Sequence, residues 1–363
     1  MPQKRVSRIL LTGGHAATPA IAVVEEIKNR QGNINIFWAG SKYAMPGSDS
    51  TTVEYKILPL LGAKFYPISM GKLQTKFTRY TIPLLLNIPV SFIQALFVLL
   101  KVKPDLILSF GGFSSFPVIF WAYIFRIPII LHEQTAAAGR ASIASARFAE
   151  KIAIARLESQ SYFPKDKLVL TGNPVMSQVL SVTPKSKIGM PPTLLVMGGS
   201  RGSQFINEEL GKIVESLQKD YKIIHIMGET NGRSALPSET SRYKVLSFVD
   251  PREMAKYYRQ SDIIISRAGA NSVSEIMYIC RPAILIPLPR TYASEQVKNA
   301  EFAEKFGIAK VMREPEVNPE SLIREINNIR DTWQKRVDVV RKKTNPDVRS
   351  AGKLVDILES YLP

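Results

Sequence analysis

The feature that most constrains the fold is a regular alternation of short apolar runs with helical or loop segments. In the first half of the chain, apolar runs of strand length lie at residues 8–11, 33–39, 64–68, 106–109, 128–131 and 151–155. The pattern restarts with runs at residues 193–197, 222–227, 244–248, 263–266, 283–287 and 309–312. Strands that alternate with helices form a parallel sheet with right-handed crossovers. The sequence therefore predicts an α/β chain with two tandem Rossmann-like, doubly wound domains.

The two series are separated by a segment that shows neither pattern. Residues 171–192 contain four prolines among scattered polar residues, which is typical of a linker. We expect an N-terminal domain at residues 1–172, a linker at 173–192 and a C-terminal domain at 193–340. We expect residues 341–363 to form a C-terminal helix that packs back on the N-terminal domain. Tandem sheets of this kind bind ligands in a cleft between the carboxyl ends of their strands.

Residues 263–299 contain the clearest candidate for a phosphate site. A strand ending at Ser266 leads through a turn of small residues into a helical pattern that starts behind Ser272. The first amides of a helix have no intrahelical partner and the helix dipole favours negative charge, so a diphosphate fits there. Glu275 follows one turn into the helix, where a carboxylate can accept hydrogen bonds from both hydroxyls of a ribose.

The same stretch continues with polar side chains that suit a sugar. A second strand at 283–287 leads into a loop, and the amides of Gln296 and Asn299 follow it. Such amides can read sugar hydroxyls. The alternative is an ordinary βαβ unit with a polar loop.

The charge of the chain favours an anionic partner. With 48 Lys and Arg against 31 Asp and Glu, the net charge is +17. Residues 1–180 hold 20 of the basic and 9 of the acidic side chains, and no acidic residue lies between Glu54 and Asp105. This indicates a surface built for something negative on the N-terminal half, or else a solvated basic face. A nucleic-acid-binding module is disfavoured, because basic and aromatic residues are not interleaved and no recognition motif is present.

One apolar segment has the length of a membrane span. Residues 81–100 carry no charge over twenty positions. Pro83, Pro89, Asn87 and Gln94 argue against a span, and the segment occupies the place of a crossover helix. We therefore predict a partly buried helix with an apolar face that lies in a membrane interface. A purely structural core helix is the alternative.

Cysteine content and the N-terminus limit the other classes. The single cysteine, Cys280, excludes an internal disulfide and any site with several Cys ligands, and it is expected to be a small core residue within a helix. The apolar run near the N-terminus has about four residues, too few for the core of a signal peptide. The expected location is the cytoplasm.

Four turns with glycine stand at strand ends, and none matches a full dinucleotide or Walker A motif. They are Thr12-Gly13-Gly14-His15, Phe110-Gly111-Gly112-Phe113, Gly198-Gly199-Ser200-Arg201-Gly202 and Arg267-Ala268-Gly269-Ala270. Three further motifs occur in a fixed order with them: His132-Glu133-Gln134, Gly172-Asn173-Pro174 and Ser274-Glu275-Ile276. With these seven motifs the chain resembles the MurG family of bacterial peptidoglycan glycosyltransferases, over about residues 10–310.

The resemblance implies a GT-B fold and inverting transfer of N-acetylglucosamine from UDP-N-acetylglucosamine. The acceptor in that family is lipid I, an undecaprenyl-diphosphate-linked muramyl peptide. The transfer converts lipid I to lipid II in peptidoglycan synthesis. It also implies a peripheral location on the cytoplasmic face of the cell membrane, with the anionic membrane surface as a partner. No cofactor is implied. No Asp-x-Asp motif occurs, so transfer is expected to be independent of a metal.

The resemblance assigns site residues to three roles. His15 is the candidate general base, because a neutral imidazole can take the proton of the acceptor hydroxyl; Glu133 is the competing candidate. The donor-binding residues it implies are Thr12, Gly13, Gly14, His15, Ser200, Ala270, Asn271, Ser272, Glu275, Gln296 and Asn299. The acceptor-binding residues it implies are Gly111, Gly112, His132, Glu133, Gln134 and Thr135.

The chain departs from the family pattern in three places. Thr135 stands where Asn is usual, and Met176 replaces an Arg associated with the nucleotide end of the donor. The loop between His15 and Pro19 has one residue more than usual. Two alternatives therefore stay open: a UDP-sugar transferase with a different lipid acceptor, and a UDP-N-acetylglucosamine 2-epimerase. His225 is expected to be a core strand residue.

Overall fold

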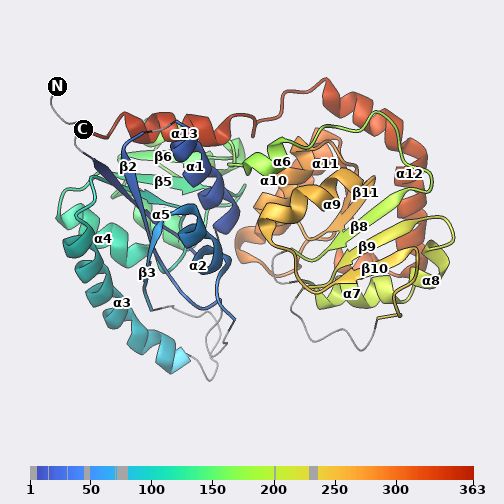
Figure 1. Ribbon diagram of the computed structural model, residues 1–363, viewed down its shortest axis with the longest axis horizontal. Coiled ribbons are helices and arrows are strands. Elements are labelled where there is room, and N and C mark those ends of the chain that lie inside the picture. Colours follow the sequence, from blue (N-terminus) through green and yellow to red (C-terminus); the bar gives the residue numbers. More distant parts are fainter. Residues whose placement is uncertain are drawn as a thin grey trace. The chain divides into compact units, whose positions relative to one another are not determined.

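The computed structural model describes residues 6–14, 16–30, 32–44, 50–69, 71, 81–199, 202–228 and 236–363 (Figure 1). The chain forms two compact units. The first comprises Met1–Pro174 together with Pro346–Pro363, and the second comprises Val175–Asn345.

The first unit contains a seven-stranded sheet in which every pairing is parallel, in the order β3-β2-β1-β4-β5-β6-β7. Its strands are β1 (Ser7–Thr12), β2 (Ile34–Gly40), β3 (Lys64–Pro67), β4 (Leu106–Ser109), β5 (Ile129–Glu133), β6 (Lys151–Ile154) and β7 (Leu168–Leu170). Thr12 pairs with Ser109, which pairs with Leu131, so the turns that follow β1, β4 and β5 lie next to one another.

Helices cover both faces of this sheet (Figure 1). The helices of the first unit are α1 (Ala17–Asn29), α2 (Val53–Ile57), α3 (Thr81–Val102), α4 (Phe116–Ile124), α5 (Arg140–Ala146) and α13 (Ser350–Glu359). One core cluster joins strand residues such as Leu10 and Ile107 to α3 and α4 through Leu99 and Ile119. On the other face, α13 contacts α1, and Arg30 forms an ion pair with Asp356 at 2.7 Å.

Helix α3 has an apolar face toward the core and a second one toward solvent. Leu84, Ala95 and Leu99 are buried. The exposed face carries Ile82, Leu85, Leu86, Val90, Ile93, Phe97 and Leu100. Within the described part of the chain, Leu84–Val102 is long and apolar enough to cross a membrane by length and composition, with a mean hydropathy of 1.9 and 28% of it buried.

The second unit contains a six-stranded parallel sheet in the order β10-β9-β8-β11-β12-β13. Its strands are β8 (Thr193–Met197), β9 (Lys222–Ile226), β10 (Tyr243–Leu246), β11 (Ile263–Ser266), β12 (Ala283–Leu285) and β13 (Ala309–Val311). Ser266 pairs with Met197 on one side and Leu285 on the other, which aligns the carboxyl ends of β8, β11 and β12.

The helices of the second unit are α6 (Ser177–Leu180), α7 (Gln204–Gly211), α8 (Val214–Leu217), α9 (Met254–Gln260), α10 (Ala270–Tyr278), α11 (Glu295–Phe306) and α12 (Pro319–Arg341). Sequence defines the start of α12: Asn318 and Ser321 form a reciprocal capping box, and Pro319 occupies the first helical position. This helix places Trp333 in the core beside Ile265, and the indole Nε1 donates to Asp262 O at 2.8 Å.

The predicted α/β class is confirmed, and each of the twelve apolar runs overlaps a strand. Three local expectations need correction. The edge strand β7 was not predicted, and α6 lies inside the segment predicted as a linker. Cys280 is buried as expected, but α10 ends before it and its φ is 52°.

Candidate functional site

The strongest candidate site lies in the second unit, where β11 ends and α10 begins. Gly269 is the N-cap of α10 and supplies no side-chain cap to the first turn. A Cβ built on Gly269 meets nothing within 4 Å, so the approach to the turn is open. Backbone amides at the start of α10, from Ala270, Asn271 and Ser272, therefore face a region that an anionic group can enter.

Glu275 lies one turn into α10 and is nearly buried, with an exposed fraction of 7%. Its Oε2 accepts a hydrogen bond of 2.6 Å from the hydroxyl of Tyr258, which lies on α9 and is 1% exposed. Burial raises the pKa of Glu275 to about 7, and the hydrogen bond from Tyr258 opposes part of that rise. No local sequence pattern around Tyr258 indicates this contact, because its partner lies on another helix.

Arg267 connects the turns around this site. Its guanidinium donates to Ser203 Oγ at 2.9 Å and to Ile286 O at 3.1 Å, and it pairs with Glu314 at 2.6 Å. Ser203 is the N-cap of α7, and its hydroxyl accepts from Ile206 N. Because these partners follow β8, β12 and β13, one buried cation holds four strand ends together. The sequence placed Arg267 in a glycine turn but gave no sign of this role.

The glycine turn after β8 needs glycine for close approach of the backbone. A Cβ on Gly198 would lie 2.1 Å from Ser203 N. Gly202 has a φ of 78°, and a Cβ there would lie 2.1 Å from Met227 O. Ser200, the donor-site residue predicted in this turn, lies outside the described residues.

The two predicted sugar-reading amides, Gln296 and Asn299, both lie on α11. Their contacts are with the loop after β12 and with the turn between β11 and α10. Gln296 Oε1 accepts from Leu288 N at 3.0 Å. Asn299 is 3% exposed, and its Nδ2 donates to Ala268 O at 3.3 Å. Both side chains therefore shape the loop and the turn that surround the start of α10.

In the first unit, the glycine turns after β1 and β4 are in backbone contact. Gly14 N donates to Gly111 O at 3.0 Å, and a Cβ on Gly112 would lie 2.7 Å from Gly14 N. Gly13 O accepts from Ser114 Oγ at 3.0 Å. Thr12 is buried at the end of β1, and its hydroxyl has no hydrogen-bond partner among the described residues. His15 lies outside the part of the chain that the structure describes.

His132 and Glu133 lie on β5 itself, because that strand extends two residues beyond the predicted run. His132 is fully buried and its Nε2 donates to Gly172 O at 3.1 Å. Burial lowers the pKa of His132 to about 4, so the ring is neutral. This places His132 between β5 and the Gly172-Asn173-Pro174 turn, as a support for that turn.

The Glu133 carboxylate is directed into the loop that follows it. Oε1 accepts from Thr135 N at 3.2 Å and from Thr135 Oγ1 at 2.8 Å, and Oε2 accepts from Gly139 N at 3.3 Å. Burial raises the pKa of Glu133, while the Ser142 hydroxyl and these other donors lower it. Gln134 Nε2 donates to Phe110 O at 3.5 Å. Glu133 therefore organises the loop through the carboxylate that a general base would need free.

Two further residues flagged by the sequence are buried in the second unit. Met176, which the sequence marked as a departure from the family pattern, is fully buried at the N-cap of α6. His225 is the core strand residue that was expected: it is fully buried on β9, and its ring nitrogens contact Tyr243 OH at 3.1 Å and Asn207 Oδ1 at 2.9 Å.

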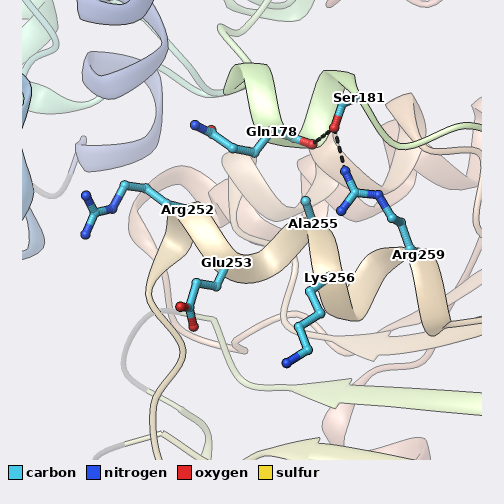
Figure 2. Close-up of a pocket in the computed structure, with 7 residues that line it drawn as sticks. All are labelled: Gln178, Ser181, Arg252, Glu253, Ala255, Lys256 and Arg259. Carbon is cyan, nitrogen blue, oxygen red and sulfur yellow. Dashed lines mark hydrogen bonds between the residues drawn. The ribbon is translucent and has the colours of Figure 1, made fainter.

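A hollow between α6 and α9 is separate from these residues. It is lined by Gln178, Ser181, Arg252, Glu253, Ala255, Lys256 and Arg259. Figure 2 shows Arg252, Lys256 and Arg259 pointing in different directions, and Arg259 donates to Ser181 Oγ at 2.7 Å. Because these three cationic side chains do not converge on one point, the hollow has no preformed binding site for an anion. Within the described ranges, no three His, Cys, Asp or Glu side chains group as a metal site.

Comparison with known proteins supports the resemblance. Residues 12–154 match the glycosyltransferase family 28 N-terminal domain, and residues 193–353 match the family 28 C-terminal domain. A UDP-N-acetylglucosamine--N-acetylmuramyl-(pentapeptide) pyrophosphoryl-undecaprenol N-acetylglucosamine transferase from Clostridium kluyveri is 32% identical over 368 residues, which covers 98% of this chain and 100% of the relative.

Two solved structures show the same fold. A MurG from Acinetobacter baumannii has a TM-score of 0.71 at 23% identity, with 98% of this chain and 99% of that chain covered. A putative UDP-N-acetylglucosamine 2-epimerase from Listeria monocytogenes has a TM-score of 0.68 at 14% identity, with 98% and 96% covered.

Proposed function

Because the chain belongs to glycosyltransferase family 28, with a GT-B fold, we propose that it transfers N-acetylglucosamine from UDP-N-acetylglucosamine to an undecaprenyl-diphosphate-linked muramyl peptide. The product of this reaction is the disaccharide-bearing lipid of peptidoglycan synthesis. The transferase relative from Clostridium kluyveri is 32% identical over the whole chain, whereas the Listeria monocytogenes epimerase is 14% identical and supports the fold alone.

One observation supports the donor site most strongly. Glu275 is nearly buried one turn into α10, and the N-terminus of that helix has no side-chain cap. The diphosphate binds at the amides of Ala270, Asn271 and Ser272. The Glu275 carboxylate accepts hydrogen bonds from the ribose hydroxyls, because the bond from Tyr258 occupies only one of its lone pairs. Departure of UDP leaves charge on a diphosphate oxygen, and the positive end of α10 stabilises that charge in the transition state.

The acceptor side of the reaction is assigned to the first unit. The acceptor hydroxyl attacks the anomeric carbon, the bond from that carbon to the diphosphate oxygen breaks, and the hydroxyl proton passes to His15. Gly111, Gly112 and the loop shaped by Glu133 and Thr135 contact the acceptor. Thr135 keeps one hydroxyl where an Asn would offer an amide, so its contact with the acceptor differs from the usual one.

The first unit also suits a lipid-linked acceptor, and we assign it to the cytoplasmic face of the membrane as a peripheral protein. Helix α3 packs on α4, whose last turn exposes Tyr123 and Ile124 and is followed by exposed Phe125. Exposed basic residues, Lys101, Lys103 and Arg126, lie at the ends of these helices. Apolar burial and attraction to anionic lipid together hold a soluble domain at a membrane surface.

The test is an assay of the purified protein with UDP-N-acetylglucosamine, with and without a lipid-linked muramyl acceptor. We expect release of UDP and a disaccharide-bearing lipid only when the acceptor is present. Conversion of UDP-N-acetylglucosamine to the manno sugar in the absence of acceptor would establish the epimerase instead. An acceptor series that lacks the muramyl peptide but keeps the lipid diphosphate separates the proposed acceptor from a different lipid acceptor.

A further inference from the structure

We propose that Tyr258 is a positioning residue of the donor site: its hydroxyl holds one oxygen of Glu275 so that the remaining lone pairs face the ribose diol. The proposal rests on the donor-binding role proposed above for Glu275. Tyr258 touches neither the donor nor the reacting atoms in this assignment, so it acts through Glu275.

The geometry of the pair carries the proposal. The distance from Tyr258 OH to Glu275 Oε2 is 2.6 Å, which is the length of a charge-assisted hydrogen bond from a hydroxyl to a carboxylate. Both side chains are buried or nearly so, at 1% and 7% exposure. The other contact of the hydroxyl in the described structure is Met197 Sδ at 4.0 Å, which is a weak acceptor. The hydroxyl therefore commits its one proton to Glu275.

The pair also joins two separate elements. Tyr258 is on α9 and Glu275 is on α10, so the orientation of the carboxylate depends on how α9 packs. Helix α9 packs against β8, whose last residue is Met197. A carboxylate held from the side by a rigid phenol loses less conformational entropy when the ribose binds than one that rotates.

The hydroxyl affects the charge of Glu275 as well as its direction. Among the described residues, Tyr258 is the only titratable group whose hydrogen bond or charge shifts the pKa of Glu275, and burial is the larger and opposing cause. Loss of the hydroxyl leaves the carboxylate without that donor, so its pKa rises above about 7 and less of it is ionised near neutral pH. A neutral carboxyl is a poorer acceptor for two hydroxyls.

A purely structural role predicts a different outcome. If the bond only satisfies a buried phenol, Tyr258→Phe lowers stability and leaves the donor KM and its pH profile unchanged. If Tyr258 positions Glu275, Tyr258→Phe raises the donor KM by roughly 10–100-fold, the range for a hydrogen bond to a charged group. In that case kcat at saturating donor and the acceptor KM change by less than about threefold. The reason is that the lost interaction stabilises the bound donor equally in the ground state and in the transition state.

The chain offers a matched control on the same helix. Tyr257 is 8% exposed, and the described structure shows no hydrogen bond from its hydroxyl. Tyr257→Phe removes the same atom from the adjacent residue, so it is expected to leave the donor KM unchanged. The acid limb of kcat/KM for the donor is expected to move to higher pH in Tyr258→Phe and to stay in place in Tyr257→Phe.

Glu275→Gln separates the failure of this proposal from the failure of the donor assignment. If Glu275→Gln leaves the donor KM unchanged, the donor role of Glu275 is wrong. If Glu275→Gln raises the donor KM while Tyr258→Phe raises it no more than Tyr257→Phe does, the donor site stands and the positioning role is overturned.

A double variant keeps the test decisive if Tyr258→Phe folds poorly. The Tyr258→Phe, Glu275→Gln pair holds no buried carboxylate that lacks its donor. Its donor KM is expected to equal that of Glu275→Gln, because both changes act on the same contact. A further tenfold rise in the double variant would show that Tyr258 acts independently of Glu275, and the proposal would be wrong.

Discussion

Asp347 accepts hydrogen bonds from both terminal nitrogens of Arg156, at 2.6 and 2.8 Å, although 191 positions separate the two residues in sequence. The Asp347 side chain is 0% exposed and that of Arg156 is 3% exposed. The same carboxylate accepts from Asn173 N at 2.7 Å. All three residues belong to the first unit, and Asn173 and Asp347 each lie within two residues of a point where the chain passes between the units, at 174–175 and 345–346.

Removal of Asp347 is expected to destabilise the first unit strongly. Asp347→Ala leaves Arg156 buried without this counter-ion, which typically costs about 3–5 kcal/mol. Asp356→Ala is the control, since Asp356 is an exposed partner of Arg30 and such pairs contribute about 0–1 kcal/mol. Urea unfolding of both variants measures the difference. Equal, small losses would show that the Arg156–Asp347 pair does not stabilise the fold.

Glu275 is expected to make stability depend on pH. Burial raises its pKa in the folded protein to about 7, from an ordinary value of 4.5. The folded state therefore holds the proton more tightly than the unfolded state, and this contribution is fully present below pH 4.5 and lost as pH rises through about 7. The loss amounts to about 3 kcal/mol, at 1.36 kcal/mol for each pKa unit.

Urea unfolding of wild type and Glu275→Gln between pH 4 and 8 measures this effect. The stability of the variant relative to wild type is expected to increase across that range, because glutamine stays neutral. Exposed Glu215→Gln is the control. A pH-independent difference between wild type and Glu275→Gln would contradict the raised pKa.

His15 is expected to carry the proton transfer of the reaction. His15→Ala is expected to lower kcat by about two to four orders of magnitude, the range for loss of a general base. Glu133→Gln is expected to act mainly on the acceptor KM, because the Glu133 carboxylate organises the loop at Thr135 and Gly139. Steady-state kinetics with each substrate varied measure both. Wild-type kcat in His15→Ala together with an inactive Glu133→Ala would move the base to Glu133.

The sheets could be predicted because a buried parallel strand is a continuous apolar run. Ile263–Ser266 is such a run, with every residue buried, and the register with its neighbours follows from the packing of both faces. Leu168–Leu170 shows the limit of this signal. It is a three-residue edge strand with no fully buried position, so its pattern does not differ from that of a loop.

The donor site could be predicted only in part, because its supporting contacts are tertiary. A turn of small residues before a helix identifies Gly269, and the position one turn later identifies Glu275. Tyr258 and Arg267 have no local signal, since their partners come from other elements. The inward direction of Glu133 was also beyond the sequence, because it depends on β5 continuing to that residue and on the donors of the loop after it.

Membrane binding is expected to depend on the exposed face of α3. Ile93, Phe97 and Leu100 are 55%, 65% and 51% exposed and lie about one turn apart. Replacement of all three with Ser removes apolar area that a membrane would bury, which is expected to weaken vesicle binding by at least about tenfold. Turnover of a long-chain acceptor is expected to fall with it, while a short water-soluble acceptor analogue is used at the wild-type rate.

The control is Val339→Ser, an exposed apolar position on α12 in the second unit, which is expected to leave vesicle binding unchanged. Binding of the wild type is expected to require anionic lipid and to weaken as salt rises, because Lys101, Lys103 and Arg126 contribute about 1 kcal/mol each near an anionic surface and are screened over about 8–10 Å. Vesicle binding that does not change with salt would show that these basic side chains do not contribute to it. Resistance of the wild-type protein to extraction by alkaline carbonate would show that Leu84–Val102 spans the bilayer, and the peripheral assignment would then be wrong.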